Sequence, residues 1–144
     1  MTHVRGIVLV VATLLPALPG WAQSAPDPVQ RVVDAYVGLY RKDTLQEWRA
    51  LFLPTFTATS TNRDGSTTAR TLDQFVESQA RGFAEATEMS ESLEHVAIER
   101  SGRLATAWAD FEFRHDGTAR RGRLVLTLIE DGARWRIASL MFSY

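Results

Sequence analysis

The chain has 144 residues and carries 16 Lys and Arg against 17 Asp and Glu, so its net charge is close to zero. A balanced charge lacks the electrostatic footprint of a protein that binds nucleic acid or an anionic membrane. The sequence contains no Cys, which excludes disulfides and a lipid-anchoring cysteine, so we expect a domain that is stabilised by its core alone.

The N-terminal residues have the pattern of a secretory signal peptide. Arg5 precedes an apolar run over residues 6–18, Pro19-Gly20 interrupts it, and Ala22 is a small residue suited to a cleavage site. The run is shorter than the roughly 20 apolar residues of a membrane span. We predict a signal peptide over residues 1–22, cleaved after Ala22, and a periplasmic or secreted product that is not membrane-bound. An uncleaved anchor is the alternative.

Residues 23–27 are expected to form a linker, and residues 28–144 a single domain. Asp27-Pro28 predicts the start of a helix, because an acidic N-cap is followed by Pro at the first helical position. Apolar residues then recur at helical spacing as far as Tyr40. A short second helix is predicted from Thr44, ending before Pro54.

The next segment is predicted to contain one strand and a third helix. Residues 56–61 are Thr-rich and alternate in polarity, which indicates a strand, and residues 62–66 suit a turn. Thr71 is a good N-cap for a helix whose buried stripe runs from Leu72 to Phe83.

From Glu91 to Tyr144 the sequence predicts four strands joined by tight turns at Ser101-Gly102, Asp116-Gly117 and Asp131-Gly132. Two-residue turns fix the register, and register decides which side chains share a face. The expected cross-strand pairs include Ile98 with Ala105, Phe113 with Arg120, and Leu128 with Trp135. Helices followed by a meander predict an α+β domain, in which three N-terminal helices pack on one face of a strongly curved antiparallel sheet.

The face expected to meet the helices has small residues at its centre, namely Ala105, Ala107, Ala109, Gly122 and Ser139. Bulky helix aromatics above them could leave a cone-shaped cavity or could fill that space, since protein interiors contain few voids. Both possibilities remain open from the sequence.

Two charged residues are expected on this inner face, Glu94 and Arg120. A buried charge needs a partner, so Arg120 would pair with Glu94, a backbone carbonyl or a bound anion; alternatively, both lie at the solvated rim. As the one carboxylate expected on the inner face, Glu94 is the candidate general base. The candidate ligand-binding residues are Arg120, Tyr36, Tyr40, Glu94, Trp135, Ser139 and Met141.

Metal and cofactor chemistry have little support in the sequence. His115 is expected in a turn and His95 on the outer face, and no Cys is present, so we predict no metal site and no cofactor. The outer face of the sheet is instead expected to carry an apolar patch, which is typical of an interface. We predict a sheet-on-sheet homodimer through Trp108, Ile129, Leu140 and Phe142.

Several segments resemble the nuclear transport factor 2-like superfamily, in particular its polyketide-cyclase-like and lumazine-binding-like bacterial members. They are the Trp-containing strand at residues 107–113, the turn at Asp116-Gly117, Arg120-Arg121-Gly122, and the closing strand at residues 132–137. The resemblance covers nearly all of residues 28–144 and implies that fold with a cone-shaped cavity. One fold hosts many functions, so it implies no single activity.

Many of these relatives place a His two residues before the Gly, where this chain has Arg120. Arg cannot act as a base near neutral pH, so the departure favours holding an anion over acid–base catalysis. We expect an exported, homodimeric protein that binds an unidentified small, partly apolar, anionic molecule through Arg120. The alternatives are an isomerase, cyclase or dehydratase that uses Glu94 as base and Tyr36 or Tyr40 as acid, or a protein-interaction module.

Overall fold

The computed structural model describes residues 25–62 and 64–144. The predicted signal peptide and the first part of the predicted linker lie outside the described residues. In the described part, no helix is both long and apolar enough to cross a membrane.

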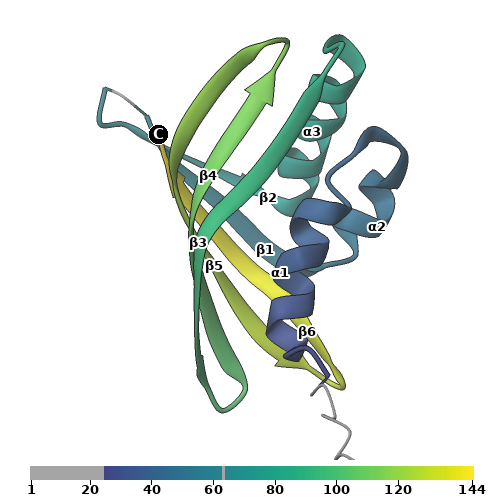
Figure 1. Ribbon diagram of the computed structural model, residues 1–144, viewed down its shortest axis with the longest axis vertical. Helices are drawn as coiled ribbons and strands as arrows, with labels where there is room; N and C mark the ends of the chain where they lie inside the picture. Colours follow the sequence, from purple (N-terminus) through teal and green to yellow (C-terminus); the bar gives the residue numbers. More distant parts are fainter. Residues whose placement is uncertain (1–24, 63) are drawn as a thin grey trace, which may run out of the picture.

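Three helices lie on the concave side of a six-stranded sheet, which confirms the predicted α+β class (Figure 1). The sheet order is β2-β1-β6-β5-β4-β3, with β1 parallel to β6 and every other neighbouring pair antiparallel. In chain order the elements are α1 (Pro28–Gly38), a 3-10 turn (Lys42–Thr44), α2 (Leu45–Arg49), β1 (Phe52–Thr61), β2 (Thr67–Thr71), α3 (Leu72–Glu85), β3 (Met89–Ser101), β4 (Leu104–His115), β5 (Thr118–Asp131) and β6 (Arg134–Ser143).

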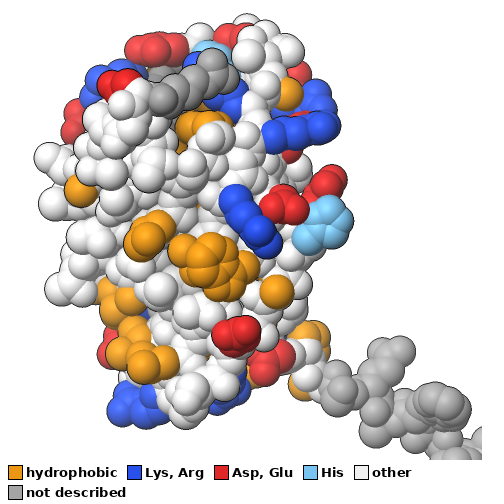
Figure 2. Space-filling view, turned by 90° about the vertical axis from the view of Figure 1, so that its left-hand side faces the viewer, with side chains coloured by type: hydrophobic (Ala, Val, Ile, Leu, Met, Phe, Trp, Pro, Cys, Tyr) orange, Lys and Arg blue, Asp and Glu red, His pale blue; other side chains and the backbone are white. Residues whose placement is uncertain are grey.

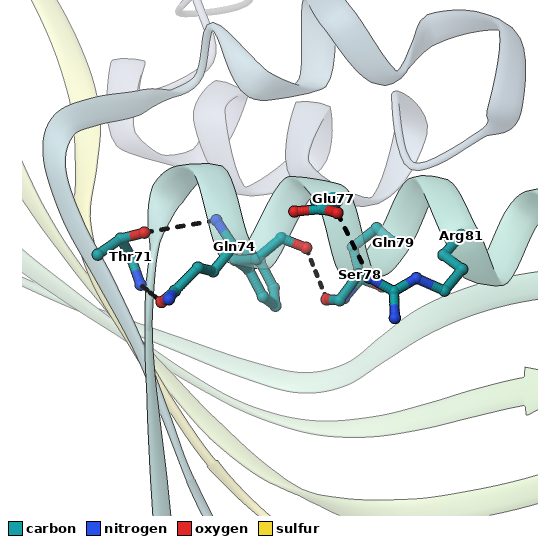
Figure 3. A network of polar contacts seen from close by, with 7 residues as sticks. Thr71, Gln74, Glu77, Ser78, Gln79 and Arg81 are labelled. Carbon is teal, nitrogen blue, oxygen red and sulfur yellow. Dashed lines mark hydrogen bonds and ion pairs between the residues drawn. The ribbon is translucent and has the colours of Figure 1, made fainter.

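Two helix starts are those predicted. Asp27 Oδ1 accepts hydrogen bonds from the backbone N–H groups of Val29, at 2.7 Å, and Gln30, at 3.4 Å. At the start of α3, Thr71 and Gln74 form a reciprocal capping box, with bonds of 3.0 and 3.4 Å (Figure 3). Both caps satisfy backbone donors that a helix leaves unpaired at its first turn.

The segment between α1 and α3 differs from the prediction in two ways. Helix α2 ends at Arg49, and Pro54 lies inside β1, where the pairing with β6 is irregular between Phe52 and Thr57. Pro lacks the N–H that a regular ladder requires, so an irregular stretch is where it fits. Strand β2, at the edge of the sheet, was not predicted.

The three hairpins confirm the meander and correct part of its register. Asp116-Gly117 forms the predicted turn, and Phe113 pairs with Arg120 as expected. The other two loops lie one residue further on, at Gly102-Arg103 and Gly132-Ala133, so that Ile98 pairs with Ala107 and Leu128 with Ile137. In each of these loops the glycine takes the first position, with φ of +59° or +65°. These shifts are by two residues, so they change partners and leave the faces unchanged.

Two bulges do change the faces. On β3, His95 and Val96 oppose the single residue Ala109, and His95 adopts a φ of +52°. On β6, Ala138 is an extra residue between Ile137 and Ser139. One extra residue reverses the alternation beyond it.

The first bulge makes the inner-face prediction for Glu94 wrong. Glu94 pairs with Asp110 and lies on the outer face, whereas Glu91, paired with Phe113, lies on the inner face.

The second bulge makes the predicted sheet face wrong for four further residues. Ser139 and Met141 lie on the outer face instead of the inner one, while Leu140 and Phe142 lie on the inner face instead of the outer one. Leu140 is accordingly 2% exposed and Met141 is 54% exposed.

Candidate ligand-binding cavity

A cavity of about 250 Å³ lies between helices α1 and α3 and the concave face of the sheet. Seven aromatic side chains line it together with a smaller set of polar ones. The aromatic residues are Tyr36, Tyr40, Phe75, Phe111, Phe113, Phe142 and Tyr144. The polar residues are Ser60, Asn62, Arg70, Ser78, Gln79 and Glu91. A chamber that combines aromatic walls with polar groups has the character of a small-molecule site.

The cavity does not lie over the small residues at the centre of the sheet. Ala105, Ala107 and Ala109 are buried members of the core and do not line it. Gly122 has a different role, because a Cβ there would lie 2.1 Å from the backbone carbonyl oxygen of Ser143 and 2.8 Å from Cε1 of Phe111. The absence of a side chain at Gly122 thus allows both the backbone of β6 and the Phe111 ring, which lines the cavity, to approach closely.

Glu91 is the acidic residue of the cavity. Its Oε1 atom is buried and has no hydrogen-bond partner among the described residues. Burial raises the pKa of Glu91 from its ordinary 4.5 to about 7, and an interaction with the Tyr36 hydroxyl opposes that rise. A carboxyl of this kind changes its protonation state near neutral pH.

Tyr36 and Tyr40 both line the cavity from α1 and the residues that follow it. Burial, and next the charge of Glu91, raise the pKa of each tyrosine well above its ordinary value, so both remain protonated at neutral pH. Each hydroxyl has a single proton to donate.

The hydroxyl group of Tyr40 takes part in a chain of hydrogen bonds. Its hydroxyl donates to Gln79 Oε1 at 2.5 Å, Gln79 Nε2 donates to Ser78 Oγ at 3.1 Å, and Ser78 Oγ donates to the Phe75 carbonyl at 2.7 Å. Figure 3 shows Ser78 and Gln79 together on α3. Since the Tyr40 proton is already used, Tyr36 is the one of these two phenols that can donate toward Glu91 or a ligand.

The other predicted site residues lie elsewhere. Trp135 is buried away from the cavity, with the guanidinium carbon of Arg100 at 4.7 Å from its ring centroid. Arg120 is exposed, and its guanidinium carbon lies 5.7 Å from the ring centroid of Tyr144. Arg120 therefore stays at the rim, where its charge remains solvated. Ser139 and Met141 face away from the cavity on the outer side of the sheet.

The lining residues that were missed include three with a polar or charged group, namely Arg70, Gln79 as a polar group, and Glu91. Arg70 belongs to β2, whose five residues include three threonines. This β-branched content was the one feature of the segment that could have indicated a strand. Gln79 was assigned to the buried stripe of the third helix without a polar role. Glu91 was not predicted to line the cavity, because the bulge that places it on the inner face contains no glycine and could not be recognised from the local sequence.

The described residues contain no cluster of three or more His, Asp or Glu side chains that could hold a metal ion. His95 instead pairs with Asp110 on the outer face, with Nδ1 and Oδ2 2.9 Å apart. Neither His95 nor His115 lines the cavity.

The outer face carries a row of neighbouring apolar residues that we call the Trp108 patch: Ala97, Trp108, Val125 and Met141. Trp108 is 46% exposed. Figure 2 shows apolar side chains gathered on this face beside basic and acidic ones. Ile129 lies on the same face, opposite Arg136.

Comparison with known proteins assigns the fold. Residues 29–144 match the SnoaL-like domain family. No curated protein matches the chain significantly.

Solved structures share this architecture at low sequence identity. A Kribbella flavida protein is 12% identical, with 81% of this chain and 87% of the other covered and a TM-score of 0.68. A Novosphingobium aromaticivorans protein, provisionally named a scytalone dehydratase, is 15% identical, with 80% of each chain covered and a TM-score of 0.65. A nuclear transport factor 2-like protein of unknown function from Shewanella baltica is 16% identical, with 80% and 89% covered and a TM-score of 0.62. These matches confirm the predicted superfamily and its fold.

Proposed function

We propose that this chain, which belongs to the family of SnoaL-like domains, binds a small, partly apolar molecule in its cavity and exchanges a proton with it through Glu91. The observation that carries the proposal is that Glu91, a residue that lines the cavity, has a buried Oε1 atom without a hydrogen-bond partner among the described residues. Buried polar atoms are normally paired, so an unpaired one in a cavity wall is a candidate contact for a ligand.

The chemistry that fits is proton transfer at a carbon next to a carbonyl group. The Glu91 carboxylate would take the proton, and the electron pair of the broken C–H bond would move onto the carbonyl oxygen. Tyr36 would donate a hydrogen bond to that oxygen, which stabilises its developing charge. Glu91 would then return the proton to another carbon or to a departing hydroxyl group.

A group that both takes and returns a proton works best when its pKa is near the working pH, and burial brings the pKa of Glu91 to about 7. Isomerases, cyclases and dehydratases use such steps, and the name of one structural neighbour belongs to the last class. The base in this proposal is Glu91 and no longer Glu94, which lies on the outer face.

Binding without catalysis is the second candidate. It is favoured by the absence of histidine from the cavity lining, which leaves Glu91 as the one lining group in the described chain with a pKa shifted to near neutral. In that case the protonated Glu91 would donate a hydrogen bond to an acceptor on the ligand.

The two candidates can be separated by carboxyl NMR and a proton-abstraction probe. We expect the resonance that disappears in Glu91→Gln to titrate near pH 7. 5-Nitrobenzisoxazole opens its ring when a base removes the proton at its C3 atom, and the phenolate product is coloured. We expect wild type and the matched outer-face control Glu94→Gln to open the ring at equal rates, and Glu91→Gln to be at least tenfold slower.

Equal rates in wild type and Glu91→Gln would contradict catalysis by Glu91. If its carboxyl still titrated near pH 7, the binding candidate would replace the catalytic one. Titration of Glu91 near 4.5 would contradict the role given to its burial in both candidates.

We also propose that the domain is exported and works outside the cytoplasm. The support is the apolar run and small-residue cleavage site within residues 1–22, together with the absence of Cys. N-terminal sequencing of the protein recovered from periplasm or medium should begin at Gln23. Recovery of the full chain from the cytoplasm would contradict export.

Homodimerisation through the outer face is a further proposal, now with the Trp108 patch at its centre, because Leu140 and Phe142 face inward. The support is an exposed tryptophan and methionine in one apolar row. Light scattering should show a wild-type dimer at micromolar concentration and a Trp108→Glu monomer. A monomeric wild type would contradict the dimer.

A further inference from the structure

One arginine in the described chain combines access to the cavity with the lack of an acidic partner. Nine arginines form ion pairs within 4.0 Å, and four do not, namely Arg31, Arg70, Arg120 and Arg134. Of these four, Arg70 is the one that lines the cavity.

The fold explains why Arg70 points inward. It pairs across β1 and β2 with Ala58, which is 1% exposed in the core. Directly paired residues share a face of the sheet, so Arg70 lies on the concave side. The next residue, Thr71, forms the capping box of α3, which fixes the backbone beside Arg70.

Arg70 and Glu91 approach the cavity from opposite edges of the sheet, β2 and β3. They are not within ion-pair distance, and the pKa of Glu91 is governed by burial and Tyr36 with no effect from Arg70. The cavity therefore has a cationic end and a separate proton-transfer end. A guanidinium presents paired N–H donors that match a carboxylate in a bidentate arrangement.

We propose that Arg70 binds the carboxylate of the substrate, so that the cavity accepts small, single-ring carboxylic acids and presents their reacting carbon to Glu91. The proposal rests on the proposed function, which identifies this cavity as the site, and it adds the class of substrate. Arg70 takes over the anion-binding role that the sequence assigned to Arg120.

Size and charge favour a monocarboxylate. At about 30 Å³ per molecule of liquid water, 250 Å³ corresponds to roughly eight waters, which suits a molecule with on the order of ten non-hydrogen atoms. One guanidinium balances one negative charge, whereas a phosphate ester would bring close to two. The aromatic walls suit a flat, apolar ring.

The test uses benzoate and its uncharged counterpart benzamide, measured by titration calorimetry. We expect wild type to bind benzoate at least tenfold more tightly than benzamide, and Arg70→Met, which keeps an apolar stem, to lose that preference. Arg120→Met is the matched control at the rim and should retain it. Glu91→Gln should bind benzoate as tightly as wild type or more tightly, because it removes a negative charge from the cavity.

Arg70→Lys provides a second variant should Arg70→Met fail to fold. It keeps the charge and loses the bidentate geometry, so its preference for benzoate should fall below that of wild type and stay above one.

Three results would overturn the inference: no binding of benzoate to wild type, equal binding of benzoate and benzamide, or loss of the preference in Arg120→Met with retention in Arg70→Met. If charge recognition fails while Glu91→Gln still slows the ring-opening probe, the proposed function survives without this substrate class. If Glu91 titrates near 4.5 while Arg70→Met still loses benzoate, the anion site survives without the proposed chemistry.

Discussion

The concave face of the sheet is filled at one end and hollow at the other. At the filled end Trp48 is 0% exposed, with its ring centroid 4.7 Å from that of Phe52. Its Nε1 donates to the Tyr36 carbonyl at 2.8 Å. At the hollow end, rings such as Phe113 surround an open chamber.

Polarity separates the two ends. The filled end pairs large helix aromatics with buried alanines of the sheet, so apolar atoms can close upon each other. The hollow end contains Glu91, Arg70 and Gln79, whose polar groups are costly to bury against apolar walls. Polar lining groups can thus hold a cavity open in a folded chain, because they do not pack favourably against apolar side chains.

The largest expected effect on the free energy of unfolding is at the filled end. Trp48→Ala should destabilise the domain by about 3–5 kcal/mol, because it leaves a void among packed rings and removes a buried hydrogen bond. Phe113→Ala at the hollow end should lose less than about 2 kcal/mol, since its ring already borders open space. Urea unfolding measures both. Equal losses would mean that the two ends are packed alike.

The second prediction concerns the pH dependence of stability. The pKa of Glu91 is about 7 in the folded chain and 4.5 in its ordinary state, so the folded state holds more protons between these values, and its stability falls as the pH rises through that window. Glu91→Gln removes this penalty. We expect equal stability of variant and wild type at pH 4 and a gain on the order of 3 kcal/mol at pH 8.

Urea unfolding at the two pH values measures this effect. Glu94→Gln is the control for a general effect of removing an acid, because Glu94 is exposed on the outer face. A Glu91→Gln variant no more stable than wild type at pH 8 would contradict the raised pKa.

The smallest effect tests the wall of the cavity. Gly122→Ala should cost about 1–3 kcal/mol, because the added Cβ would lie 2.1 Å from the backbone carbonyl oxygen of Ser143 and 2.8 Å from Cε1 of Phe111, so that both the end of β6 and the ring would have to shift. Gly38→Ala is the matched control, since a Cβ there has nothing within 4 Å and its φ is not positive; its effect should be near zero or slightly stabilising. A neutral Gly122→Ala would show that the end of β6 and the Phe111 ring both move freely enough to admit a methyl group.

The sequence predicted the features that depend on short-range chemistry. The caps at Asp27 and Thr71 and the turn at Asp116-Gly117 involve residues within a few positions of one another, so their hydrogen bonds and φ angles follow from local residue types. Tyr36 and Tyr40 were found as cavity residues from helical periodicity. Strand β2 and its Arg70 were missed, because five residues at a sheet edge carry little periodic signal.

The sequence by itself determined the α+β class, two of the helix starts and the four-stranded meander. The tertiary structure alone decided which carboxylate reaches the cavity. Glu91 and Glu94 are three residues apart, and the bulge at His95 and Val96 sends the first inward and the second outward. A bulge forms where the partner strand and the curvature of the sheet require it, and those requirements come from contacts across the sheet that no local pattern records.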